Sequence, residues 1–236
     1  MAKIIMFGNQ KGGVGKSQCT LLVAAALSKA PFNLRVSVID TDKQKSIVGQ
    51  RRLDVLGYGA GEPIPFAVLD YSINDLQQNI AQLDKEYDII LFDTAGKLDT
   101  DADLDTQEVT KAMAYVDYLF LPFTAGMFTF GATLQFFRFA EKMQTERQAS
   151  PRPLNVIGFV NLFKFRSRRH AYLLEDIGKL VKSANLNFME TRLGEFASFA
   201  EADTFQSFYA PLSSDPAKAN FTSWLNEFCK TIKITN

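Results

Sequence analysis

Residues 3–29 read KIIMFGNQKGGVGKSQCTLLVAAALSK, an apolar run, a glycine-rich segment and a second apolar run in direct succession. The first run, Lys3 to Phe7, has the length and composition of a buried strand. The second, Ser17 to Lys29, is long enough for a buried helix. A strand, a glycine turn and a helix in this order predict the start of a parallel α/β sheet.

The glycine-rich turn has the chemistry of a phosphate-binding loop. Consecutive backbone N–H groups at the start of a helix attract a polyphosphate, and the helix dipole adds positive potential. Lys16 is predicted to reach the β and γ phosphates, and the hydroxyl of Ser17 to coordinate Mg²⁺. The alternative is a glycine-rich turn that binds no nucleotide. The predicted nucleotide-binding residues in this segment are Lys11, Gly12, Gly13, Val14, Gly15, Lys16, Ser17 and Gln18.

Two later apolar runs end in acidic residues, Leu34 to Asp40 and Asp88 to Asp93. Because the carboxyl ends of parallel strands meet at one edge of the sheet, these carboxylates and Asp42 are expected near the phosphate loop. Carboxylates there can hold Mg²⁺ or its water, or position an attacking water. The alternative for Asp40 and Asp42 is a solvated turn.

One departure from the general pattern G-x-x-x-x-G-K-[ST] is informative. That pattern requires glycine at position 10, where this chain has Gln10, and a lysine, Lys11, lies five residues before Lys16. In this respect the chain resembles the ParA/MinD family of ATPases, whose phosphate loop is deviant. Residues 40–44 similarly resemble the family's D-x-D-x-Q motif, with Lys43 where the family commonly has proline.

The resemblance implies an ATPase that uses ATP and Mg²⁺ and forms a homodimer when ATP is bound. It implies that Asp42 orients the hydrolytic water and that Lys11 of each subunit reaches the nucleotide phosphates of the other. Asn161, after a predicted strand, would contact adenine, or would equally suit a turn. The predicted catalytic residues are then Lys11, Lys16 and Asp42, and the predicted metal site comprises Ser17, Asp40 and Asp93.

The rest of the chain continues the alternation of strands and helices. The strand candidates are Lys3 to Phe7, Leu34 to Asp40, Phe66 to Leu69, Asp88 to Asp93, Tyr118 to Pro122, Val156 to Val160 and Asn187 to Met189. The helix candidates are Ser17 to Lys29, Ser46 to Leu56, Ile73 to Leu83, Asp103 to Tyr115, Thr129 to Arg147, Ser167 to Ser183 and Ala217 to Thr231. Seven strands interleaved with helices predict a doubly wound, mainly parallel α/β sheet with helices on both faces, as in P-loop NTPases. We expect one domain over residues 1–236. Gly96 and residues 97–105 suit a loop that responds to the γ-phosphate, and the alternative is a solvated connection.

Composition limits the choice of partners. The 26 Lys and Arg residues balance 26 Asp and Glu residues, so no global basic field indicates a nucleic-acid binder. Cys19 and Cys229 match no metal or redox spacing. The apolar run at the N-terminus is too short for a signal peptide, and no stretch is long enough to cross a bilayer. We therefore expect a cytoplasmic protein.

Members of the ParA/MinD family differ in what they bind. The chain begins at its first strand, which leaves no room for an operator-binding domain, so DNA binding should be non-specific. The predicted DNA-binding residues form a cluster at the start of a helix: Lys164, Arg166, Arg168 and Arg169. The alternative for this cluster is a solvated helix start.

The C-terminal stretch Phe221 to Lys233 has few cations, so it is interpreted as a core helix and no membrane is expected. The resemblance then favours a nucleoid-associated partition ATPase, stimulated by a ParB-like or other cargo adaptor protein. The alternatives are a MinD-like membrane-positioning ATPase and a metabolic or metal-carrier P-loop enzyme.

Overall fold

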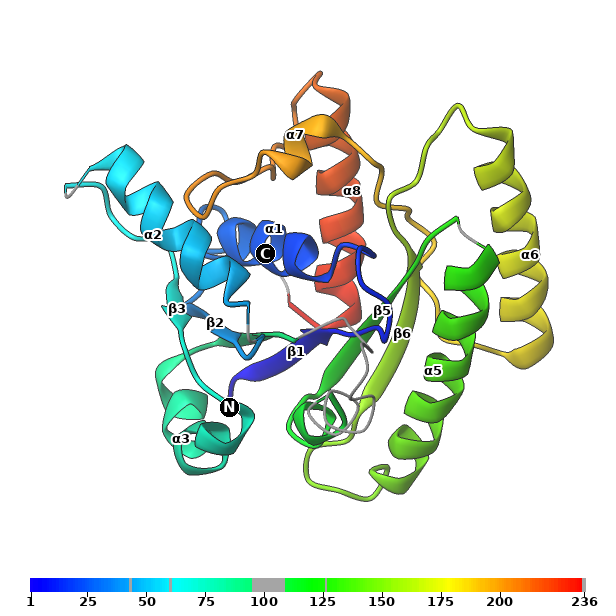
Figure 1. Ribbon diagram of the computed structural model, residues 1–236, viewed down its shortest axis with the longest axis horizontal. Helices are drawn as coiled ribbons and strands as arrows, with labels where there is room; N and C mark the ends of the chain where they lie inside the picture. Colours follow the sequence, from blue (N-terminus) through cyan, green and yellow to red (C-terminus); the bar gives the residue numbers. More distant parts are fainter. Residues whose placement is uncertain (43, 60, 95–108, 126, 235–236) are drawn as a thin grey trace.

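The computed structural model describes residues 1–42, 44–59, 61–94, 109–125 and 127–234. Within them, six strands form one parallel sheet in the order β3-β2-β4-β1-β5-β6 (Figure 1). The strands are β1 (Lys3–Phe7), β2 (Val36–Asp40), β3 (Ala67–Leu69), β4 (Ile89–Asp93), β5 (Tyr118–Phe123) and β6 (Asn155–Val160). The first strand is central, between β4 and β5, so the loop after it leaves the middle of the sheet.

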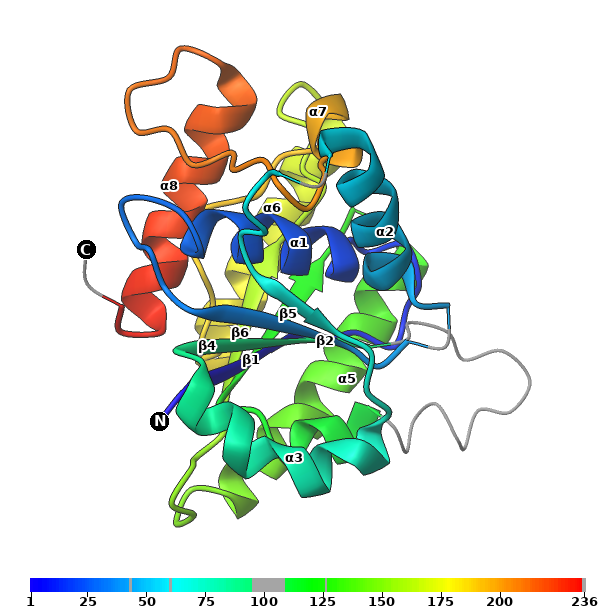
Figure 2. The ribbon, with the colours of Figure 1, turned by 90° about the vertical axis from the view of Figure 1, so that its left-hand side faces the viewer.

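Helices cover both faces of this sheet, as predicted. They are α1 (Lys16–Leu27), α2 (Ser46–Tyr58), α3 (Ile73–Glu86), α5 (Met127–Glu146), α6 (Arg168–Ala184), α7 (Ala197–Ala200) and α8 (Pro216–Thr231). In Figure 2, α1, α2, α7 and α8 lie on one side of the sheet and α3 and α5 on the other. The predicted P-loop NTPase-like α/β fold is confirmed.

Two apolar cores fill the two faces. One joins α1 and α8 to the sheet, and the other joins α3, α5 and α6 to it. In the first core, the ring of Phe7 lies 5.9 Å from that of Phe228 and 6.2 Å from that of Trp224, centroid to centroid. Both partners belong to α8 and are fully buried. The prediction that the C-terminal helix packs on the core is therefore confirmed.

The seventh predicted strand, Asn187 to Met189, is wrong. Only Phe188 pairs with the sheet, in a single parallel bridge to Gly158. The Gly158 N–H donates to the carbonyl of Asn187, and the Met189 N–H donates to the carbonyl of Gly158. A Cβ on Gly158 would lie 2.3 Å from the Phe188 ring, so the segment approaches β6 closely at one point only.

The predicted helix Asp103 to Tyr115 is seen in part, because residues 109–113 are helical and residues 114–115 form a turn. Its first residues, 103–108, lie outside the described residues, as do Gly96, residues 97–105 and Lys43. No helix in the described ranges is both long and apolar enough to cross a membrane.

Candidate nucleotide-binding site

The glycine-rich loop joins the carboxyl end of β1 to α1 and requires glycine at two positions. Gly13 and Gly15 have φ angles of 73° and 87°, in the left-handed region that L side chains rarely adopt. A Cβ on Gly15 would also lie 2.4 Å from Nδ2 of Asn161. The loop conformation therefore depends on both backbone freedom and close approach.

The start of α1 is open to an anion. Gly15 caps the helix with no side-chain hydrogen bond, and the first turn contains no acidic residue. No side chain of the first turn of α1 therefore caps its backbone N–H groups or offsets the positive end of its dipole. This is the arrangement predicted for phosphate binding.

Lys16 is drawn back against the loop. The residue is only 7% exposed, and its Nζ donates to the carbonyl of Lys11 at 3.5 Å. Burial lowers the pKa of Lys16, while the negative charges of Asp93 and Asp42 oppose that change. A bound polyphosphate would add the negative charge that this buried ammonium lacks.

Asp93 ends β4 with a fully buried carboxylate, and among the described residues neither of its oxygens has a partner at hydrogen-bond geometry. Burial raises its pKa to about 7. The Ser17 hydroxyl and Lys16 oppose the rise, and Asp40 and Asp42 add to it. Unsatisfied buried carboxylate oxygens are costly, so this group fits a cation or its bound water.

The remaining metal chemistry agrees with Mg²⁺. The described part of the chain contains no group of three or more His, Cys, Asp or Glu residues able to hold an ion. Mg²⁺ commonly binds through one or two carboxylates and the phosphates of a ligand, without an all-protein cage. Asp93 and the hydroxyl of Ser17 therefore fit the predicted metal.

Asp40, also predicted for the metal site, has other partners. One carboxylate oxygen accepts from the N–H groups of Ile47 and Val48, both at 3.1 Å, and the other accepts from Asp42 at 3.2 Å. Burial raises the pKa of Asp40, and these bonds together with Lys45 oppose the rise. Its carboxylate holds the N-terminus of α2, and its place in the metal shell stays a prediction.

Asp42 lies in the turn after β2 and is partly exposed. Its Oδ1 accepts from the Gln44 N–H at 2.8 Å, which folds the turn back on itself. The preceding Thr41 donates through its N–H and its hydroxyl to the carbonyl of Asp93. This places Asp42 beside the end of β4, where a water-positioning role is geometrically open and stays a prediction.

Asn161 lies where predicted, at the carboxyl end of β6, but it contacts the loop itself. Its Nδ2 donates to the carbonyl of Val14 at 2.8 Å, and its Oδ1 is buried with no partner in the described ranges. The residue is 1% exposed. Asn161 therefore supports the phosphate loop, and the predicted adenine contact stays untested.

Sequence reasoning missed Asn9, a fully buried residue two positions after the end of β1. Its Nδ2 donates to the carbonyl of Pro122 and to the Thr133 hydroxyl, and its Oδ1 accepts from the Lys11 N–H. A polar amide between a buried strand and a glycine turn was the only signal available. Its partners Pro122 and Thr133 lie 113 and 124 residues away in the sequence.

The basic cluster lies at the same edge of the sheet as the phosphate loop, because it comes after the carboxyl end of parallel β6. Its four cations, all exposed, are Lys164, Arg166, Arg168 and Arg169, and the three arginines form no ion pair with another described residue. Lys164 is the one that is paired, with Glu195 at 3.3 Å. The Lys164 N–H donates to Nδ1 of His170, which therefore has a structural partner.

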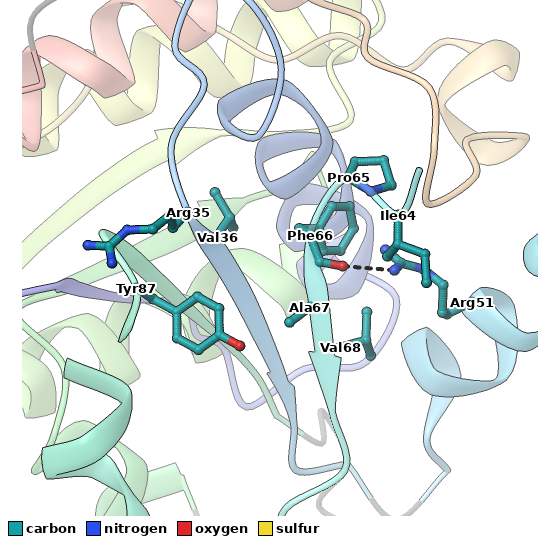
Figure 3. Close-up of a pocket in the computed structure, with 9 residues that line it drawn as sticks. All are labelled: Arg35, Val36, Arg51, Ile64, Pro65, Phe66, Ala67, Val68 and Tyr87. Atoms are coloured by element: carbon teal, nitrogen blue, oxygen red, sulfur yellow. Dashed lines mark hydrogen bonds between the residues drawn. The ribbon is translucent and has the colours of Figure 1, made fainter. Parts of the chain in front are cut away.

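A cavity of about 560 Å³ lies away from this edge (Figure 3). It is bordered by β3 and by the start of β2, with Ile64 and Pro65 on one side and Arg35 and Tyr87 on the other. Arg51 crosses beside it and donates to the carbonyl of Phe66 at 2.8 Å. The cavity therefore has no part in the phosphate site.

Comparison with known proteins identifies the family. Residues 5–207 match the CobQ/CobB/MinD/ParA nucleotide binding domain. The chain belongs to this family. It is a ParA/MinD-family ATPase, so the predicted resemblance and the predicted enzyme class are both confirmed. No curated protein matches it in sequence.

Several solved structures share its fold at low sequence identity. A plasmid partition protein from Borrelia burgdorferi is 20% identical, with a TM-score of 0.59 over 96% of this chain and 99% of its own. A McdA variant of Cyanothece, in complex with ATP, is 12% identical, with a TM-score of 0.67 over 100% and 98%. Cobyrinic acid a,c-diamide synthase from Mycobacterium smegmatis is 14% identical, with a TM-score of 0.67 over 99% and 96%. The last structure contains an ATP analogue and magnesium, the predicted cofactor pair.

Proposed function

We propose that this chain is a partition ATPase that acts as a single domain over residues 1–236. ATP and Mg²⁺ join two subunits, the dimer holds non-specific DNA, and a ParB-like or other cargo adaptor protein stimulates the hydrolysis that releases it. The protein would then associate with the nucleoid. The site described above supplies the nucleotide chemistry, and the basic cluster supplies the DNA contact.

The observation that carries the nucleotide part is the pairing of an open helix start with the unsatisfied carboxylate of Asp93. Backbone N–H groups of the loop bind phosphate oxygens, and Lys16 moves from the Lys11 carbonyl to the β and γ phosphates. Bound Mg²⁺ would neutralise charge on those phosphates. Ser17 and Asp93 would hold the ion, and Asp42 would orient the attacking water.

A calorimetric titration tests the nucleotide part. Lys16→Ala should abolish ATP binding, because backbone N–H groups alone leave the phosphate charge under-compensated. Thr222→Val is the matched control, since Thr222 is buried in α8 and its hydroxyl accepts from the Ala210 N–H. ATP affinity of Lys16→Ala near that of the parent would remove Lys16 from this role.

The observation that favours DNA over a membrane is the contrast between the two candidate surfaces. Arg166, Arg168 and Arg169 lie at the edge that also carries the phosphate loop. The apolar face of α8, the candidate for a membrane-binding helix, is buried: Trp224 and Phe228 have no exposed surface. A basic surface can release counterions from phosphates, whereas α8 has no free apolar face to insert.

A DNA-binding measurement over a range of salt concentrations tests this surface. Changing the three arginines to alanine should weaken binding alike for every sequence and make the logarithmic salt slope shallower by roughly 3 per subunit. ATP turnover without DNA should stay near that of the parent. If the variant has the same DNA affinity and salt slope as the parent, the three arginines do not form the DNA-binding surface.

The second candidate function is a MinD-like membrane-positioning ATPase, since MinD of Aquifex aeolicus shares the fold with a TM-score of 0.63 at 16% identity. A vesicle co-sedimentation assay with anionic lipid, run with ATP and with ADP beside the DNA assay, separates the two. ATP-dependent sedimentation without ATP-dependent DNA binding would favour the membrane function.

A further inference from the structure

The buried amide of Asn9 ties the phosphate loop to the far half of the sheet. Its Nδ2 donates to the carbonyl of Pro122 in β5 at 3.0 Å and to the hydroxyl of Thr133 in α5 at 2.9 Å. Both Asn9 and Thr133 have no exposed surface. Two acceptors on different elements fix the orientation of the amide, so its oxygen has one available direction.

That oxygen accepts from the backbone N–H of Lys11 at 3.0 Å. In this structure, the carbonyl of Lys11 also accepts from Nζ of Lys16 at 3.5 Å. Because Lys16 moves to the phosphates in the proposed ATP-bound state, the Asn9 bond is the one of the two that still holds the Lys11 backbone there. The Lys11 residue itself is exposed. The amide of Asn9 thus fixes the backbone from which an exposed lysine side chain extends.

We propose that Asn9 is a positioning residue, which sets the direction of Lys11 toward the nucleotide of a second copy of this chain. The inference rests on the proposed function, namely its ATP-bound dimer, and on the role across that dimer that the family resemblance implies for Lys11. Asn9 contacts neither the start of α1 nor Asp93 in the described hydrogen bonds, so its effect passes through Lys11. Its removal frees the Lys11 backbone and spreads the side chain over many directions.

The experiment compares ATP-dependent dimerisation with ADP affinity in the whole chain. Asn9→Ala should weaken the ATP-bound dimer about tenfold, as expected for one lost hydrogen bond and the added freedom of Lys11. Its ADP affinity, measured calorimetrically, should change by less than about threefold, because the helix start is intact. Light scattering and sedimentation give the dimer constant.

Two variants make the result specific. Thr133→Val removes one of the two acceptors of the Asn9 amide and should weaken the dimer by a smaller factor, about threefold. Thr222→Val removes the α8 hydroxyl that accepts from the Ala210 N–H, a bond in which no loop residue takes part. It should lower thermal stability without weakening the dimer. A purely structural role for Asn9 would make Asn9→Ala behave like Thr222→Val.

The outcomes separate the inference from the function on which it rests. Normal ATP-dependent dimers in Lys11→Ala would overturn the dimer proposal itself. Loss of the dimer in Lys11→Ala with an unchanged dimer in Asn9→Ala would overturn the positioning role alone. An equal loss of ADP affinity and dimerisation in Asn9→Ala would mean a general collapse of the loop, which also overturns it. If Asn9→Ala does not fold, the Thr133→Val result decides.

Discussion

The strands β2 and β4 both end in a buried aspartate, but the two carboxylates differ in their hydrogen-bond partners. Asp40 and Asp93 are direct partners across the two parallel strands, and neither has any exposed surface. The carboxylate of Asp40 accepts from the N–H groups of Asp42, Ile47 and Val48. That of Asp93 accepts from none of the described residues at hydrogen-bond geometry.

The difference arises from the segment after each strand. After β2 the chain turns within a few residues into α2, and the first N–H groups of that helix reach back to Asp40. The described residue after β4, Thr94, supplies no such donor, and its own hydroxyl has no partner in the described ranges. An apolar run closed by aspartate therefore identifies the edge of the site. The role of each aspartate depends on the donors that the next element brings.

The largest expected effect concerns the side of the comparison that lacks partners. Asp93→Asn should reduce ATP hydrolysis at saturating magnesium at least about a thousandfold, since the neutral amide holds the ion poorly and hydrolysis depends on it. Phosphate release is the measurement, with circular dichroism to establish that the variant is folded. A rate within about tenfold of the parent would show that hydrolysis does not need the Asp93 carboxylate as a metal ligand.

The same carboxylate should make stability depend on pH. The unfolded Asp93 ionises near pH 4, whereas burial holds its folded pKa at about 7, so the folded protein binds the extra proton between these values. The free energy of unfolding, measured by urea in metal-free buffer, should then fall as pH rises from about 5 to about 8. Asp93 contributes on the order of 3 kcal/mol to this fall.

Asp93→Asn isolates that contribution, because every other titrating group is common to the two proteins. The variant should be the more stable of the two near pH 8 and lose the advantage near pH 5. An identical pH dependence in parent and variant would mean that the folded protein stabilises the ionised Asp93 carboxylate as well as water does in the unfolded chain, so that its pKa is not raised.

On the other side of the comparison, Asp40→Ala should lower the free energy of unfolding by about 2 kcal/mol. The lost cap leaves buried N–H donors at Ile47 and Val48, and relief from burying a charge offsets part of the cost. Equilibrium urea unfolding gives the value. No loss of stability would show that the α2 N-terminus is satisfied without Asp40.

The smallest effect is expected at the rim of the same turn. Lys45 donates to the carbonyl of Asp40 and pairs with Asp70 at 2.6 Å, with side chains 30% and 53% exposed. Exposed ion pairs contribute about 0.2–1 kcal/mol, so Asp70→Asn should cost less than about 0.5 kcal/mol and less still in high salt. A loss of stability as large as that of Asp40→Ala would mean that the ion pair between Lys45 and Asp70 is as important for this turn as the cap by Asp40.

Local patterns predicted most of the fold and the centre of the site. Gly13 and Gly15 adopt the left-handed conformation that their residue type indicates, and apolar runs of strand length became β1 to β6. Such features depend on neighbours in the sequence. The extra strand at 187–189 failed because its pairing was limited to one point of contact at Gly158.

Contacts between segments far apart in the chain could not be predicted from the sequence. Asn9 bonds Thr133 across 124 positions, and Asn161 bonds Val14 across 147. No pattern of residue types specifies these pairs, since either asparagine is also a common turn residue. The metal role of Asp40 stays a prediction, and the bonds from its carboxylate to the N-terminus of α2 are visible only in three dimensions.

The two borders of the sheet have a consequence for how copies of this chain meet. A long open strand edge is a template for pairing with another chain, and so for aggregation. Here β3 is only three residues long, and the segment around Phe188 and Leu193 bonds to β6 at Gly158 and Val160. Among the described residues, neither border offers a long row of free backbone groups. Crowded molecules are therefore steered toward contacts through side-chain surfaces, which can come apart, and away from strand addition, which rarely reverses.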